Sequence, residues 1–62
     1  MNREDILWLL KNKLNTFECL RDDNIKAHVK YKDAYFQGKV HAYDLAVQNL
    51  HNVINVINGE NA

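Results

Sequence analysis

The chain has 62 residues, of which 47% are hydrophobic, and its eight basic residues balance its eight acidic residues. This balance argues against a protein that works mainly by coating nucleic acid or an anionic membrane. No apolar run approaches the roughly 18 residues of a membrane-spanning helix, and the short apolar stretch near the N-terminus does not resemble a secretory signal. We therefore expect a single soluble, cytoplasmic domain over residues 1–62.

The first predicted helix covers about residues 3–22. Asn2 is a good N-cap, and acidic residues follow it where the helix dipole is positive. Apolar residues then recur at three- and four-residue spacing, as on one face of a helix: Leu7, Leu10, Leu14 and Phe17. The run Asp22-Asp23-Asn24 predicts a turn, with Asn24 in the left-handed conformation after the helix end.

Residues 25–32 fit two interpretations. Their polarity alternates, as in a half-buried strand. However, Ile25 and Val29 also extend the helical pattern that follows, and no turn signal separates Lys32 from Asp33. A lone strand would have no partner in this chain, so we favour a helix.

The second predicted helix covers about residues 25–58 and has the stronger apolar stripe, which ends at Asn58-Gly59. The stripe consists of Phe36, Val40, Tyr43, Val47, Leu50, Ile54 and Ile57. The sequence thus predicts an all-α antiparallel hairpin of a short and a long helix. A chain this small buries little surface, and with Cys19 as its only cysteine it has no internal disulfide. We expect a homodimer in which the overhanging long helices complete a helical bundle.

Two apolar features are candidate interfaces. The run from Ile6 to Leu10 is hydrophobic on every side of the helix, which favours a second buried face at Trp8 and Leu9 over a Trp that is simply exposed. A ridge of small residues at four-residue intervals favours close packing of a helix within the hairpin or a dimer, with a ligand or target over the ridge as the alternative. The ridge is Ala34, Gly38, Ala42 and Ala46, and Phe36, Val40 and Tyr43 are further candidate interface residues.

Positive charge gathers in the middle of the chain, opposed only by Asp33 and interleaved with aromatic residues. The basic patch consists of Lys26, Lys30, Lys32 and Lys39, with His28 and His41 nearby. Such a patch can bind single-stranded nucleic acid or a nucleotide phosphate. We favour a solvated helix face, since no recognition helix, phosphate-binding loop or zinc-finger spacing accompanies the patch.

The sequence carries no sign of a catalytic or metal centre. His28, His41 and His51 are spaced so that no two share a helix face as a chelating pair. Cys19 fits a small, buried or half-buried helix residue. We expect no catalytic residue, no metal and no cofactor.

The segment Tyr35-Phe36-Gln37-Gly38-Lys39-Val40-His41-Ala42-Tyr43-Asp44 resembles small accessory proteins of phages that infect Gram-positive bacteria. In those proteins an aromatic, glycine-lysine and alanine-tyrosine pattern opens the long helix of a hairpin. The resemblance implies a phage-encoded protein that binds and inhibits a host factor, such as a component of anti-phage defence. It implies no site residues.

The residues and the resemblance together predict a non-enzymatic inhibitor or adaptor that acts on a host protein by occlusion. The alternative is a nucleic-acid or nucleotide binding protein that uses residues 26–41. A structural phage component is a third possibility.

Overall fold

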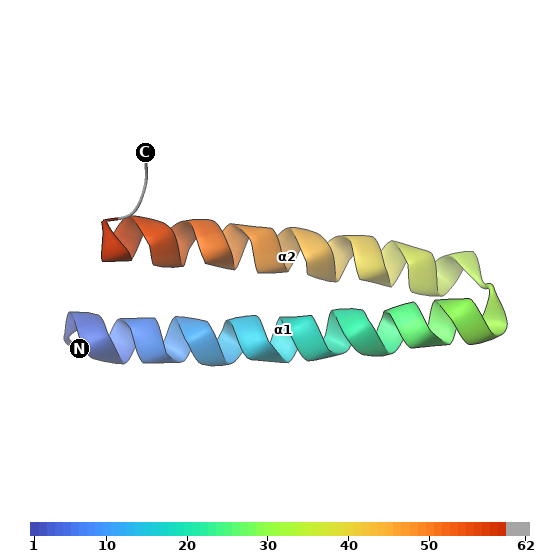
Figure 1. Cartoon of the computed structure of the whole chain (residues 1–62), viewed down its shortest axis with the longest axis horizontal. Coiled ribbons are helices and arrows are strands. Elements are labelled where there is room, and N and C mark those ends of the chain that lie inside the picture. Colours follow the sequence, from blue (N-terminus) through green and yellow to red (C-terminus); the bar gives the residue numbers. More distant parts are fainter. Residues whose placement is uncertain (60–62) are drawn as a thin grey trace.

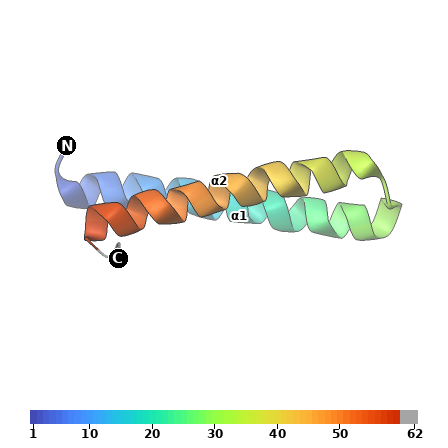
Figure 2. The ribbon, with the colours of Figure 1, turned by 90° about the horizontal axis from the view of Figure 1, so that it is seen from above.

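The computed structural model describes residues 1–59, which form two helices, α1 (Arg3–Tyr31) and α2 (Ala34–Asn58). The helices run antiparallel and side by side, so that the start of α1 lies beside the end of α2 (Figure 1). They cross at a shallow angle when viewed from above (Figure 2). No strand occurs among the described residues. The predicted all-α antiparallel hairpin is confirmed.

The predicted position of the turn is wrong. Asp22, Asp23 and Asn24 lie inside α1, where the Asn24 side-chain amide donates a hydrogen bond to the Leu20 carbonyl at 2.7 Å. Residues 25–31 are helical, as favoured, but they end α1 instead of beginning α2. The helices therefore have 29 and 25 residues. The expected overhang of a long helix over a short one does not exist.

The turn consists of Lys32 and Asp33. Lys32 adopts the left-handed conformation (φ 54°, ψ 38°), and its N–H donates to the His28 carbonyl at 2.7 Å. Asp33 is the N-cap of α2, and its side chain accepts a hydrogen bond from the Tyr35 N–H at 2.9 Å. An N-cap of this kind satisfies a backbone donor that the helix itself leaves free. Asp33, as the N-cap of α2, marks the boundary between the helices that the sequence interpretation missed.

The outer helix ends agree with the sequence. The Asn2 side chain accepts a hydrogen bond from the Asp5 N–H at 2.8 Å, as expected of an N-cap. Gly59 follows α2 with φ 74° and closes the helix in the left-handed conformation. Glycine is suited to this position because it has no Cβ to clash there.

The helices pack along a seam at which residues alternate three and four positions apart, as in a coiled coil. The α2 side is the predicted stripe, Phe36, Val40, Tyr43, Val47, Leu50, Ile54 and Ile57. The α1 side continues beyond Phe17 with polar residues: Leu7, Leu10, Leu14, Phe17, Arg21, Asn24 and His28. All of these residues are buried or half-buried, but only Val47 (4% exposed) and Ile54 (7%) are buried among residues 1–59. Neither helix in this range has a stretch long and apolar enough to span a membrane.

Candidate interaction surfaces

The two broad faces of the hairpin differ in polarity. In a seven-residue repeat abcdefg with the seam at a and d, positions c and g lie on one flank of a helix and positions b and e on the other. Because α1 and α2 run antiparallel, the c and g positions of both helices lie on one broad face of the hairpin. Their b and e positions lie on the opposite broad face.

The c and g positions form what we call the apolar face. Its apolar members are Ile6, Leu9, Leu20 and Ala27 of α1 with Ala42, Ala46, Val53 and Val56 of α2. The largest of them stay in contact with solvent: Leu9 is 42% exposed, Val53 45% and Val56 60%. The face also carries polar side chains, of which Lys13, Asp23, Lys30 and Lys39 are charged. Lys13 and Asp23 lie near the middle of α1, whereas Lys30 and Lys39 lie near the turn.

The b and e positions form what we call the polar face. On α2 all but Ala34 of its residues are polar: Gln37, His41, Asp44, Gln48, His51, Asn55 and Asn58. On α1 it includes the polar residues Lys11, Asn15, Glu18 and Asp22, but also the exposed hydrophobic residues Trp8, Ile25 and Val29. The contrast in polarity between the two broad faces is therefore clearest on α2.

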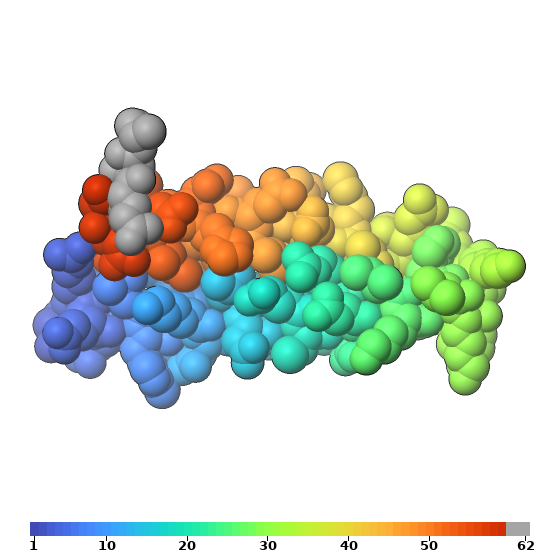
Figure 3. All heavy atoms as spheres, viewed as in Figure 1, coloured from blue at the N-terminus to red at the C-terminus, as the bar shows by residue number. Residues whose placement is uncertain are grey.

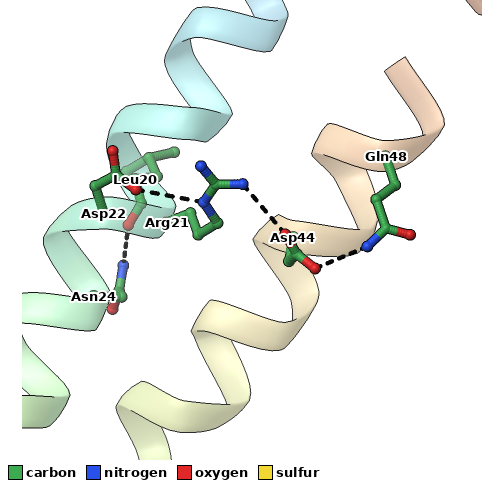
Figure 4. A network of polar contacts seen from close by, with 6 residues as sticks. All are labelled: Leu20, Arg21, Asp22, Asn24, Asp44 and Gln48. Atoms are coloured by element: carbon green, nitrogen blue, oxygen red, sulfur yellow. Dashed lines mark hydrogen bonds and ion pairs between the residues drawn. The ribbon is translucent and has the colours of Figure 1, made fainter. Parts of the chain in front are cut away.

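A polar network crosses the seam (Figure 4). The Arg21 Nη1 lies 3.2 Å from Asp44 Oδ1, and the Arg21 Nε lies 3.4 Å from Asp22 Oδ1. The Gln48 amide donates to the other Asp44 oxygen at 2.9 Å. Desolvation would lower the pKa of Arg21, but its hydrogen bonds to Asp44 and Asp22 outweigh that effect and raise the pKa.

The Arg21–Asp44 pair sets the alignment of the helices more than their stability. Its side chains are 25% and 43% exposed, and partly exposed ion pairs contribute only about 0–1 kcal/mol. Sliding one helix along the other would separate Arg21 from Asp44, so the pair favours the observed alignment. The network therefore explains the register of α1 against α2. It does not form a site with chemistry of its own.

Trp8 and Leu9 do not share a surface. Leu9 lies on the apolar face, whereas Trp8 occupies a b position on the opposite broad face and is 65% exposed. Ile25 and Val29 are on the same flank of α1 as Trp8, toward the turn, and are 42% and 68% exposed. The sequence prediction grouped Trp8 and Leu9 because they are adjacent, but the helix separates them.

The candidate interface residues on α2 divide in the same way. Phe36, Val40 and Tyr43 belong to the seam, and the rings of Phe17 and Tyr43 lie 6.0 Å apart between the helices. These three side chains are therefore used within the hairpin. Ala42 lies on the apolar face, exposed.

Gly38 makes no close contact within the hairpin. It is exposed, and a Cβ added to it would meet no atom within 4 Å apart from its immediate surroundings in the helix. Ala34 and Ala42 are also exposed, and Ala46 is half-buried. The ridge therefore does not pack closely inside the hairpin, and its close packing in a dimer stays a prediction.

The turn end gathers aromatic rings and lysines. The ring of Phe36 stacks on Tyr31 at 5.9 Å and meets the edge of Tyr35 at 5.3 Å. Lys30 Nζ lies 5.2 Å from the Tyr31 ring centroid, and Lys39 Nζ lies 4.9 Å from that of Tyr35. Interaction with the Tyr35 side chain raises the pKa of Lys39, so this lysine stays charged. Lys26, Lys30 and Lys32 are exposed, as expected of a solvated face.

The side chains that could act as nucleophiles or metal ligands are dispersed over the hairpin. Cys19 is exposed, so the expectation of a buried or half-buried residue is wrong, because Cys19 lies on the side of α1 opposite α2. Among residues 1–59, no three His, Cys, Asp or Glu side chains lie close enough together to hold a metal ion. The side chains of the two helices meet along the hairpin (Figure 3), and no pocket lies between them within that range.

Comparison of the chain with protein-family models, with curated proteins and with solved structures found no match in any of the three.

Proposed function

We propose that the chain is a small non-enzymatic protein-binding module, encoded by a phage, that inhibits or adapts a protein in the host cytoplasm. It acts as a homodimer, and it works by covering a functional surface of its target. Components of anti-phage defence are one class of target. The phage origin rests on the resemblance of residues 35–44 to phage accessory proteins.

The observation that carries the proposal is the excess of exposed apolar side chains. Within residues 1–59 only Val47 and Ile54 are buried, whereas eleven large hydrophobic side chains are exposed. Extended apolar surface on a small protein marks sites of protein–protein interaction. Seven of them occupy two separate regions: Ile6, Leu9, Val53 and Val56 on the apolar face, and Trp8, Ile25 and Val29 on the opposite flank of α1. Two regions suit a protein that binds both a second copy of itself and a target.

Trp8 is the best candidate for the contact with the target. Tryptophan is enriched among the residues that dominate binding energy, because its large ring excludes water over a wide area. At 65% exposure, Trp8 buries little of its ring against the hairpin. It also lies off the apolar face, so it remains accessible when that face is covered.

The test is capture of the target from a lysate of a Gram-positive bacterium with tagged wild-type protein and tagged Trp8→Ala. We expect the wild type to retain one host protein and Trp8→Ala to retain at least tenfold less of that protein. A tenfold loss of affinity corresponds to about 1.4 kcal/mol of binding free energy. Leu45→Ala is the matched control, since Leu45 is also exposed (47%) but lies on the outer side of α2. Equal capture by Trp8→Ala and the wild type would refute this assignment of the contact.

A second candidate function is supported by the turn end, where lysines lie over exposed tyrosine rings. Stacking platforms with nearby positive charge bind single-stranded nucleic acid, and such binding weakens steeply as salt rises. If the chain binds an oligonucleotide, we expect the charge reversals Lys26→Glu, Lys30→Glu and Lys32→Glu together to abolish binding and leave helicity intact. Binding that ignores both the salt concentration and these changes would exclude this candidate.

A further inference from the structure

We propose that a second copy of the chain covers the apolar face in an antiparallel twofold arrangement, with α1 against α1 and α2 against α2 of the partner. The inference rests on the homodimer of the proposed function and specifies its surface and geometry. The turns of the two hairpins then lie at opposite ends of the dimer.

The size of the apolar face fits this occupant. The hairpin is 43 Å long, and two helices with their side chains give a width of about 20 Å. A face of this size supplies the roughly 800 Å² that each partner contributes to a standard stable interface. Two hairpins joined in this way form a four-helix bundle, whose core is shared by residues of the seams and of the apolar faces.

The charges on the apolar face select the antiparallel arrangement. Lys13 and Asp23 are equally far from residue 18, close to the middle of α1 (Arg3–Tyr31). A twofold axis that crosses the middle of the helices therefore places Lys13 of each copy opposite Asp23 of the other. Both copies form the same pair, so two opposite-charge contacts flank the axis. Like-charge contacts at these positions would be unfavourable.

The same axis crosses α2 at a small residue. Ala46 is the middle residue of α2 (Ala34–Asn58) and lies on the apolar face. On the axis, Ala46 meets Ala46 of the other copy, where a small side chain lets two helices approach closely. The axis passes the middle of both helices because the hairpin register sets residues near 18 beside residues near 46, consistent with the Arg21–Asp44 contact.

Distance measurement between spin labels tests the arrangement. A nitroxide is attached to Glu4→Cys in a Cys19→Ser background, since Glu4 is exposed at the start of α1 on the polar face. The antiparallel dimer places the two labels at opposite ends, about the 43 Å hairpin length apart. A parallel twofold, with both turns at the same end, would bring them within about 25 Å, roughly two helix diameters, and would overturn the arrangement. A monomer, with no dipolar coupling, would overturn the choice of a second copy.

Oxidative cross-linking gives a second test that does not depend on the label. Ala46→Cys in the Cys19→Ser background should form a covalent dimer under mild oxidation. Gln48→Cys is the matched control, because Gln48 lies two residues away on α2 and is more exposed than Ala46, but belongs to the polar face. We expect at least tenfold more dimer from Ala46→Cys, and equal yields would overturn the proposal. Neither test involves Trp8, so a failure here leaves the proposed target contact to be judged by its own capture experiment.

Discussion

A few residues decide where this hairpin turns. Lys32 accepts the left-handed conformation that residues other than glycine adopt at a cost of about 1–2 kcal/mol, and Asp33 restarts the helix as an N-cap. The triplet Asp22-Asp23-Asn24 has a composition that is more typical of turns, yet it stays helical. Local turn chemistry therefore identified the wrong segment, because the packing of both helices along the seam outweighs it.

The position of the turn can be tested with one pair of substitutions. Lys32→Gly should raise the free energy of unfolding by about 0.5–1 kcal/mol, because glycine removes the strain at φ 54° and only part of the gain is lost to the flexibility of the unfolded chain. Asp23→Pro should lower it by about 3 kcal/mol or more, because proline breaks the interior of a helix. Urea denaturation followed by circular dichroism measures both changes.

The opposite pattern would restore the turn to residues 22–24. A proline would then be tolerated at position 23, and a glycine at position 32 would weaken a continuous helix by about 1 kcal/mol.

At the scale of the helices, the seam residues of α2 could be predicted more completely than those of α1, although both helices were predicted with inner ends nine residues from where they lie. The α2 stripe from Phe36 to Ile57 is apolar at every seam position, and the structure confirms its seam. The α1 seam becomes polar after Phe17, with Arg21 and Asn24 at positions where an apolar residue would have extended the pattern. Hydrophobic periodicity cannot detect a helix face whose buried positions are polar, so the prediction ended α1 too early.

The polar half of the α1 seam is satisfied by contacts that no periodicity reveals. Arg21 pairs with Asp44 from the other helix, and Asn24 bonds to the Leu20 carbonyl of its own helix. Both partners become neighbours only when the chain folds into the hairpin or the helix. The separation of Trp8 from Leu9 was within reach of the sequence, because the predicted stripe through Leu7 and Leu10 already places them on opposite flanks of α1.

At the scale of the whole molecule, the hairpin has one seam and two buried side chains among residues 1–59. An isolated pair of helices with so little buried surface has marginal stability, since the loss of conformational entropy on folding offsets most of the gain from burial. Covering the apolar face doubles the number of helices that each helix contacts. In the proposed dimer, folding and association are therefore one process.

Coupled folding and association makes the melting temperature depend on protein concentration. A tenfold dilution of such a dimer costs about 1.4 kcal/mol, which for two 62-residue chains lowers Tm by about 5 °C. Val53→Asp, which puts a charge on the apolar face, should lower Tm and remove its dependence on concentration. His51→Asp is the matched control, because His51 lies two residues before Val53 on α2 and is exposed on the polar face. Its replacement leaves the apolar face intact. Circular dichroism melts at protein concentrations from about 1 to 100 μM test for coupled folding and association. Over this range the Tm of the wild type should rise by about 10 °C. A wild-type Tm that is the same across this range would show that the hairpin folds alone.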